Sequence, residues 1–371
     1  MPHPGAHAML PATDHDEAAR MEFVFSFKEH VTKDVAAGTK HAFDHRVSPS
    51  LERTLGRAPE NRHEVHRAIK HDPYWQMSGS LSRLYQELKQ EVGESVAHRR
   101  FDDLSARARG IRAKAKHTTL RLDPSLPIPR YQTAVDIHLM PGSYYTDRGA
   151  DDVTAGAIYD PGVYMFAMGS MGPYNEDMGL AVIKWIKQHR PNFRPKRILD
   201  MGCAVGHCTL PYSEAFPAAE IHAIDVGAPV LRYAQARAES LGRAIHFSQQ
   251  NAEATDFPDG HFDLIVSHIL LHETSHKAIY TIMRECHRLL SPGGLVLHGD
   301  VPFFNQKADP FTAFTRDWST HYNAEPFWGT LHDMDLRAPA QDAGFAPDSI
   351  ILDNSAASAV PWMVYGASKE V

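Results

Sequence analysis

The segment Arg197-Ile-Leu-Asp-Met-Gly-Cys-Ala-Val-Gly-His207 decides how the rest of the chain is interpreted. Its apolar start predicts a buried strand that ends in Asp200, and the residues after Asp200 predict a glycine turn opening a helix. Gly202 and Gly206 allow the backbone to approach a ligand that a side chain would hold away. The next helix would direct free N–H groups at that ligand. Dinucleotide-binding folds use a similar turn, so the class depends on the order of the elements beyond it.

The order of elements after this turn predicts a doubly wound sheet. Residues 220–225 form a short alternating strand that ends in Asp225, at a spacing from Gly202 that suits an acid reaching ribose hydroxyls. Further strands are expected at 245–247, 262–267 and 295–298, with helices at 229–241 and 278–290 and closing antiparallel strands within 349–368. Alternation of strands and helices predicts a parallel sheet whose ligand lies outside the carboxyl ends of the strands.

These segments resemble the class I S-adenosylmethionine-dependent methyltransferases, of the small-molecule "methyltransferase domain 11/25" type. Asp200-Met-Gly-Cys-Ala-Val-Gly206 is similar to the family's first motif, D-x-G-x-G-x-G, and Asp225 matches the acid that ends the second strand. Asn251-Ala-Glu253 with 257–263 resembles the adenine-side segment, and 288–294 resembles the turn before the fifth strand. The resemblance covers 194–301, and more weakly extends to 371. It implies a Rossmann-like seven-stranded sheet and S-adenosyl-L-methionine as the cofactor.

The resemblance and the residue chemistry together nominate the cofactor-binding residues. The Asp225 carboxylate can accept hydrogen bonds from both ribose hydroxyls, and the backbone of 202–206 can hold the methionine part. Ala204 stands where the family has its middle glycine, and Asn251 stands where many relatives carry Asp. The expected cofactor-binding set is Asp200, Gly202, Cys203, Ala204, Gly206, Asp225, Val226, Asn251, Ala252, Glu253 and Ser267.

His272-Glu-Thr-Ser-His276 matches the H-E-x-x-H pattern of zinc proteases. Its position after the fourth strand of the methyltransferase core argues against that class, and we expect no metal. The end of this strand lies beside the transferred methyl group in the fold, so His268, His272 and Glu273 are the candidates for acceptor contact or general base. The alternative is that His272 and Glu273 only hold the start of a helix or a lid.

An aromatic stretch precedes the first motif, at 141–145 and 158–169. Aromatic faces and methionine sulfur suit a cationic cofactor, so this stretch is a candidate lid over cofactor and acceptor. Its candidate residues are Tyr144, Tyr145, Tyr159 and Tyr164. The alternative is a core segment that packs two domains together.

The expected domains are a flexible N-terminal tail (1–20), a helical N-terminal domain (21–121), a linker with the aromatic lid (122–190) and the S-adenosylmethionine-binding domain (191–371). A basic run at 99–121 could face RNA or an anionic substrate, although Asp102 and Asp103 within it favour a solvated helix face. The fold class is therefore α/β, with a mainly helical N-terminal domain.

Composition limits the partners and the compartment. A net charge of −7 disfavours a nucleic-acid groove as the main surface. Three cysteines do not suggest a disulfide framework, and neither a long apolar run nor a signal-peptide pattern is present, so we expect a cytoplasmic protein without a membrane anchor. The sequence leaves a homodimer open.

The expected reaction is direct S_N2 transfer of a methyl group to a small organic acceptor. The large helical N-terminal region and the aromatic lid favour a small acceptor held in a closed pocket. Oxygen is expected first as the acceptor atom, with sulfur and nitrogen next. Ser267-His-Ile-Leu270 lacks the N-P-P-Y pattern, which disfavours amino-methylation of nucleobases. The alternatives are an RNA methyltransferase that uses 99–121, a dinucleotide oxidoreductase, and a non-catalytic cofactor-binding protein.

Overall fold

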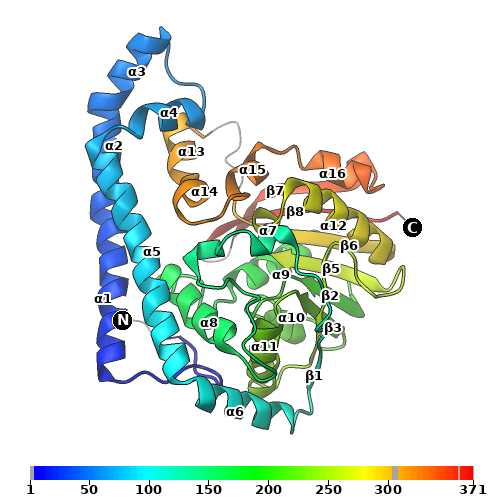
Figure 1. Ribbon diagram of the computed structural model, residues 1–371. Helices are drawn as coiled ribbons and strands as arrows, with labels where there is room; N and C mark the ends of the chain where they lie inside the picture. The colour runs from blue at the N-terminus through cyan, green and yellow to red at the C-terminus, as the bar shows by residue number, and fades with distance from the viewer. Residues whose placement is uncertain (1–3, 303–307, 358–359, 371) are drawn as a thin grey trace.

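The computed structural model describes residues 4–302, 308–357 and 360–370. It contains an eight-stranded sheet flanked by helices, and a long helical arm that runs along one side of the molecule (Figure 1). The strands are β1 (Thr118–Arg121), β2 (Arg197–Met201), β3 (Glu220–Asp225), β4 (Ile245–Gln249), β5 (Phe262–His268), β6 (Leu290–Asp300), β7 (Ile350–Ala357) and β8 (Pro361–Ser368).

The helices alternate with the strands in the second half of the chain and precede them in the first. Those of the first half are α1 (His15–His30), α2 (Ala36–Ala42), α3 (Ser48–Leu55), α4 (Arg62–Ile69), α5 (Pro73–Arg99), α6 (Phe101–Arg112), α7 (Arg130–Thr133), α8 (Thr154–Phe166) and α9 (Asp177–His189). Those of the second half are α10 (Leu210–Ala215), α11 (Ala228–Ser240), α12 (His276–Leu289), α13 (Pro310–Arg316), α14 (Trp318–Tyr322), α15 (Trp328–Asp333) and α16 (Arg337–Asp342). Short π-helical turns (Val31–Val35, Phe43–Val47) and 3₁₀ turns (η3, Ile137–Leu139; η4, Leu271–Glu273; η5, Pro347–Ser349) complete the elements.

The strand order is β1-β4-β3-β2-β5-β6-β8-β7, with β8 antiparallel to both of its neighbours. Seven of these strands form the doubly wound sheet expected from the sequence. The eighth, β1, pairs in parallel with β4 and comes from the end of the region expected to be helical, so that region also contributes to the sheet. Strands β2 and β5 are parallel neighbours, and the order in which strands are added to the sheet reverses between them. A ligand-binding crevice is expected at this point.

The two faces of the sheet are covered by different helices. Ile198 on β2 points to the face covered by α9, α10 and α11, whereas its neighbour Leu199 points to the face covered by α12, α15 and α16. This alternation is the period of two of a strand. Both side chains are fully buried, which explains the nearly continuous apolar character of the central strands.

The N-terminal helices pack against the sheet domain rather than standing apart. Helix α5 lies against α1 and α8, and α8 in turn lies against α11 (Figure 1). Phe311 and Phe314 on α13 pack with Trp75 and Ile69 of α5 and α4, so the segment after β6 is shared between the two halves. Two cavities form where these halves meet.

The described part of the expected tail is packed. Residues 1–3 lie outside the described residues, but Met9 is fully buried and the His7 imidazole lies 2.9 Å from the Asp160 carboxylate. Helix α1 already begins at His15, where Asp14 and Glu17 form a reciprocal capping box. The expectation of a loose tail is thereby corrected for residues 4–20, because a buried methionine and a buried ion pair anchor the segment.

Most of the basic run at 99–121 is paired with acidic groups of the same chain. The pairs are Arg99–Glu17, Arg107–Asp103, Arg109–Asp151, Arg112–Asp151 and Arg121–Asp256. The three cysteines are free and buried. Among the described residues, no helix combines the length and apolar character that a membrane span requires.

Candidate functional site

A cavity of about 840 Å³ opens at the carboxyl ends of the central strands; we call it the first chamber. Its floor comes from the residues that directly follow each strand, as a doubly wound sheet requires. The lining includes Gly202 and Ala204 after β2, Asp225 and Val226 at the end of β3, Gln250, Asn251 and Ala252 after β4, and His268, Ile269 and Leu270 at the end of β5.

The loop after β2 keeps its backbone close to this chamber. Gly202 has φ +75°, and a Cβ atom there would lie 2.7 Å from the Leu270 side chain. Ala204, which replaces the family's middle glycine, also has a positive φ of 44°. The Asp225 carboxylate accepts a hydrogen bond of 3.0 Å from the Ala204 N–H and so fixes the loop in this conformation.

Asp225 connects the first two strand ends. Its second oxygen accepts a hydrogen bond of 2.8 Å from the Gly227 N–H. Desolvation raises the pKa of Asp225, and the backbone N–H donors oppose that rise by favouring the carboxylate. The side chain lines the first chamber, where its remaining acceptor capacity suits a vicinal diol.

Asp200 presents an unused carboxylate oxygen beside the first chamber. Thr209 donates a hydrogen bond of 2.5 Å to Oδ2, whereas Oδ1 is buried without a hydrogen-bond partner and lies 3.4 Å from the His268 Nδ1. Asp200, Cys203 and His268 line a smaller cavity of about 390 Å³ that continues the first chamber. A buried acceptor without a donor suits a cationic ligand group such as an ammonium.

Not all of the expected cofactor residues point into the first chamber. Ser267 turns away and hydrogen-bonds His298 at 2.7 Å, and Glu253 accepts a hydrogen bond of 3.0 Å from the Tyr131 hydroxyl. Gly206 has φ +80° and shapes the loop without lining the cavity. The Asn251 side chain lines the chamber while accepting from the Glu253 N–H at 2.9 Å, so its amide oxygen already has one partner.

A second cavity of about 810 Å³, the second chamber, lies between the sheet domain and the N-terminal helices. Its walls are mostly apolar and include Trp328, Trp362, Phe166, Met171 and Ile158. Four residues line both chambers and therefore mark their junction: His138, Tyr144, Tyr159 and Ile269. The two chambers thus meet at one place, above the end of β5.

Two of the four proposed lid tyrosines lie at this junction. The rings of Tyr144 and Tyr159 meet edge to face with centroids 5.3 Å apart, and the Tyr144 hydroxyl hydrogen-bonds the His138 Nδ1. Tyr145 and Tyr164 line neither chamber, and Tyr164 is buried on α8. Helix α8, which carries Tyr159 and Tyr164, packs against both α5 and α11, and the lid role of the aromatic stretch stays a prediction.

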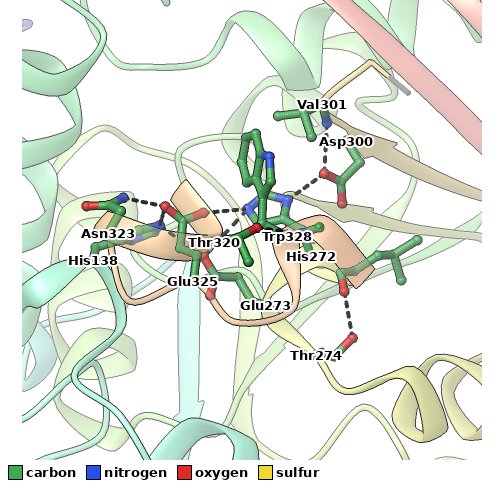
Figure 2. Close-up of polar contacts among 12 residues, drawn as sticks. His138, His272, Glu273, Thr274, Asp300, Val301, Thr320, Asn323, Glu325 and Trp328 are labelled. Atoms are coloured by element: carbon green, nitrogen blue, oxygen red, sulfur yellow. Dashed lines mark hydrogen bonds and ion pairs between the residues drawn. The ribbon is translucent and has the colours of Figure 1, made fainter. Parts of the chain in front are cut away.

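His138, His272, Glu273, Asp300 and Glu325 form a group of polar contacts, which we call the polar cluster (Figure 2). Three of them, His138, His272 and Glu325, line the second chamber. The His138 Nε2 lies 3.0 Å from a Glu273 oxygen and 3.4 Å from a Glu325 oxygen. The His272 Nδ1 lies 2.5 Å from an Asp300 oxygen, and its Nε2 lies 3.5 Å from Glu273. The cluster brings together η3, η4, the end of β6 and the α14–α15 loop.

The neighbouring carboxylates favour the protonated form of both histidines of the polar cluster. Burial alone would lower the pKa of His138, but Glu325 and Glu273 outweigh it and raise the pKa to about 9. Burial is likewise outweighed for His272, whose pKa Asp300 and Glu273 raise well above its usual value. Conversely, His138 and His272 overcome the effect of burial on Glu273 and lower its pKa to about 2.

The carboxylates beside His272 raise its pKa and so favour its protonated form, and its expected role as a general base stays a prediction. His268 lies at the other chamber: its Nε2 is 3.1 Å from the Tyr212 hydroxyl, and it lines the cavity beside Asp200. Of the three expected catalytic residues, only Glu273 lines the first chamber while also belonging to the polar cluster.

The H-E-x-x-H pattern does not lie on one helix. His272 and Glu273 belong to η4, Ser275 caps the next helix, and α12 begins at His276. A different trio, His138, Glu273 and Glu325, places one ligand atom each within 4.8 Å of the others and has the donor set of a metal site. The same three groups contact one another directly, with the His138 Nε2 3.0 Å from Glu273 and 3.4 Å from Glu325.

Ile269 is a strained residue at the junction. It has φ +59°, a conformation that β-branched residues rarely adopt, and it contacts both chambers and the cavity beside Asp200. Strain of this kind persists where the surrounding structure imposes it, and it concentrates at ligand-binding positions. The turn at Ile269 directs the chain from β5 into η4 and so places Glu273.

Sequence reasoning missed His138, Glu325, Lys89 and Trp328. None of them belongs to a motif, and they come from four separate segments that only the tertiary fold brings to the second chamber. The aspartates and glycines at strand ends predicted the first chamber, but they contain no information about these four residues.

The fold and the first chamber together define a class I methyltransferase: a doubly wound sheet, a glycine loop after β2, an acid at the end of β3 and a cavity at the strand ends. The comparisons agree. A family profile described as a methyltransferase domain matches residues 198–294. The ubiquinone biosynthesis O-methyltransferase of Pseudomonas aeruginosa is 33% identical over 174 residues, which cover 46% of this chain and 72% of that protein. The chain belongs to the class I S-adenosylmethionine-dependent methyltransferases.

Two other similar proteins match over a shorter stretch or are less identical in sequence. The demethylmenaquinone methyltransferase of Thermus thermophilus is 33% identical over 108 residues, so this chain spans 48%, about half, of its length and the match covers 29% of this chain. A solved phosphoethanolamine N-methyltransferase 2 of Haemonchus contortus, in complex with S-adenosyl-L-methionine, has a TM-score of 0.43 at 15% identity, covering 58% of each chain.

The described residues fit the family's cofactor, S-adenosylmethionine. The buried Asp200 Oδ1 lacks a hydrogen-bond donor and suits the ammonium of the methionine part. Gly202 leaves the space that a side chain would fill, and Asp225 lines the chamber where a ribose diol would lie. When bound, the cofactor supplies a methyl group on a sulfonium, which a nucleophile can displace.

Proposed function

We propose that this protein methylates a hydroxyl group of a small, largely apolar acceptor that binds in the second chamber. The observation that carries this proposal is the junction: the chamber at the strand ends and the aromatic-walled chamber share His138, Tyr144, Tyr159 and Ile269. A reacting oxygen at this junction would face the cofactor side and still contact the polar cluster. Alignment of two partners in this way is a large part of what an enzyme contributes to a bimolecular reaction.

The cofactor-side assignments belong to the same proposal. Asp200 holds the ammonium, Asp225 holds the ribose hydroxyls, and the loop from Gly202 to Gly206 supports the methionine part. Asn251, Ala252 and Val226 line the adenine side. The sheet domain (191–371) provides this half of the site, and the helical domain (21–121) with the segment 122–190 provides most of the other.

Glu273 is the acceptor-side residue with a proton-handling role. Its Oε1 lies 3.0 Å from the His138 Nε2 and 3.5 Å from the His272 Nε2, whereas its Oε2 is buried without a hydrogen bond from the described protein groups. A carboxylate oxygen that lacks a donor can accept a hydrogen bond from an acceptor hydroxyl and orient its lone pair. It would then take the hydroxyl proton as the oxygen bonds to the methyl carbon and the bond from that carbon to the sulfonium sulfur breaks. The neighbouring His138 and His272 lower the pKa of Glu273, which keeps the carboxylate ionised and able to accept the hydrogen bond from the hydroxyl.

Two further observations support oxygen and a small acceptor. A neutral hydroxyl must lose a proton on methylation, which gives the carboxylate at the junction a use. The Pseudomonas relatives are named ubiquinone biosynthesis O-methyltransferases. The RNA alternative gains no support from the basic run, because five of its arginines pair with acids of this chain.

Transfer from methyl-¹³C-labelled S-adenosylmethionine to a mixed panel of phenols, alcohols, thiols, amines and bulk RNA tests the proposal. We expect label in an O-methyl product, identified by its mass and by the carbon chemical shift of the methyl group. Asp225→Ala is the cofactor-site control and Glu273→Gln is the junction variant, and both should lose the product. Label found only on nitrogen, on sulfur or in RNA would contradict O-methylation of a small molecule.

A further inference from the structure

Lys89 is a buried cation in the wall of the second chamber. It lies on α5, and only 7% of its surface is exposed. Within the described part of the chain its ammonium has neither a hydrogen bond nor an ion pair, and its nearest recorded partner is the Phe166 ring, 5.6 Å from Nζ to the centroid. Other buried cations of this protein are paired, for example Arg232 with Asp147 at 2.8 Å.

An ammonium without a counter-ion is unfavourable inside a protein. Burial lowers the pKa of Lys89 to about 8, against an opposing effect of Glu325. The value still leaves the side chain mostly cationic at neutral pH. A buried ammonium without a counter-ion lowers the stability of the folded protein, so we look for a function that compensates for this loss. An anionic group of a ligand in the second chamber is the partner available to Lys89.

Lys28 adds a second positive charge near Lys89. The Lys28 ammonium lies 3.9 Å from the centroid of the Phe166 ring, on the residue that also faces Lys89, and it donates a hydrogen bond to the Phe166 carbonyl oxygen. Burial and the neighbouring charge of Lys89 lower the pKa of Lys28 to about 7. The two lysines therefore lie close enough to repel each other, which a bound anion would relieve.

The second chamber thus carries opposite charges on its polar walls. Lys89 provides a positive group, Glu325 of the polar cluster provides a negative one, and Ile158, Met171 and the two tryptophans supply the apolar surface. Glu325 acts on Lys89 through its charge but does not pair with it, since its carboxylate faces His138 and Asn323.

We propose that Lys89 forms an anion subsite, and that the methyl acceptor is a hydroxylated carboxylic acid whose carboxylate pairs with the Lys89 ammonium. The hydroxyl of this acid then lies at the junction beside Glu273, and its apolar body lies against the aromatic wall. This inference rests on the proposed function for the position of the hydroxyl, whereas the anion subsite itself does not. A single ammonium matches the single charge of a carboxylate.

The first test compares the thermal stability of Lys89→Met with that of the wild-type protein, both free of ligand. Methionine fills a similar volume without charge, so removal of an uncompensated buried cation should raise the melting temperature by about 2 °C or more. Lys33→Met is the matched control, because Lys33 is 65% exposed and pairs with Glu29 on the surface. A lower melting temperature for Lys89→Met would assign the lysine a structural role and overturn the proposal.

The second test measures binding of matched probes to the protein saturated with S-adenosylhomocysteine, by titration calorimetry and by the fluorescence of the chamber tryptophans. The probes are 4-hydroxybenzoate and 6-hydroxyhexanoate, each paired with its neutral primary amide. We expect at least one acid to bind at least tenfold more tightly than its amide, and this preference to disappear in Lys89→Met but to persist in Lys33→Met. Equal binding of acids and amides, a preference that survives in Lys89→Met, or no binding of either acid at 10 mM would overturn the subsite.

The position of the transferred methyl group separates this inference from the proposed function. A bound acid that yields a methyl ether supports both. A methyl ester would mean that the carboxylate lies at the junction, which overturns the Lys89 subsite and leaves methyl transfer intact. A Lys89-dependent acid that binds but never becomes methylated would support the subsite and contradict O-methylation of such acids.

Discussion

The two chambers are built in different ways. The first chamber is lined by consecutive strand-end loops, and its polar contacts run largely through backbone groups, such as the Ala204 and Gly227 N–H groups that bind Asp225. The second chamber is lined by side chains from α5, α8, η3, η4 and the α14–α15 loop, and its polar contacts join buried charges. A shared cofactor requires a fixed backbone frame, whereas a particular acceptor requires side chains that can vary on that frame. We therefore expect mutations to damage the two chambers differently.

The largest difference should come from removing one partner of a buried pair in the second chamber. Asp300→Ala would leave the His272 imidazole, which is 1% exposed, without the carboxylate at 2.5 Å. Breaking such a pair typically destabilises a protein by about 3–5 kcal/mol. Urea denaturation should show a loss of this order. Glu87→Ala, which breaks an exposed pair with Arg83, is the control and should cost less than about 1 kcal/mol; equal losses would mean that the polar cluster is not a stabilising unit.

The same contrast explains what the sequence could predict. The strands from β2 to β5, the glycine turn after β2 and the position of Asp225 at the end of β3 were predicted correctly, because local apolar patterns and strand-end residues fix them. Strand β6 begins at Leu290, so part of the turn predicted at 288–294 lies within the strand. The second chamber could not be predicted, because the approach of His138 to Glu325 depends on how helices far apart in the chain pack. Tyr144 and Tyr159 are an intermediate case: composition predicted an aromatic lid with four candidate tyrosines, and only the fold shows that Tyr144 and Tyr159 line the chambers whereas Tyr145 and Tyr164 do not.

Lys89 makes the free energy of unfolding depend on pH through a residue of the second chamber. Its pKa is about 8 in the folded protein, below the 10.5 of an unperturbed lysine, so the unfolded chain binds more protons between these values. The cost of the buried charge is therefore greatest below pH 8 and disappears as the pH approaches 10.5, with an upper limit of about 3 kcal/mol.

We accordingly expect Lys89→Met to exceed the wild-type protein in unfolding free energy at pH 7, and the excess to shrink as the pH rises from 8 to 10. Using the difference between the two proteins cancels the titration of all groups that they share. Denaturant titrations at pH 7, 8, 9 and 10 measure it. A difference that stays constant with pH would show that the lysine is not desolvated.

In the first chamber, Asp225→Ala should act mainly on binding. The variant loses the acceptor for ribose hydroxyls and also releases the Ala204 and Gly227 N–H groups, so affinity for S-adenosylhomocysteine should fall about 100-fold, equivalent to about 2.7 kcal/mol. Titration calorimetry measures this loss. Asp348→Ala, at an exposed position on η5, is the control and should bind normally. Retained affinity in Asp225→Ala would remove the acid from the cofactor site.

The smallest effect distinguishes two glycines of the same loop. Gly202 and Gly206 have similar positive φ values of 75° and 80°, so alanine at either position should cost about 1–2 kcal/mol of stability through backbone strain. Only at Gly202 would the new Cβ lie 2.7 Å from Leu270, a residue that lines the first chamber; at Gly206 the nearest atoms are 3.9 Å away. Gly202→Ala should therefore displace Leu270 and weaken S-adenosylhomocysteine binding by about tenfold, or about 1.4 kcal/mol, beyond the effect of Gly206→Ala. Equal binding by the two variants would mean that the loop acts on the cofactor through its conformation alone, and that the close approach at Gly202 has no part in binding.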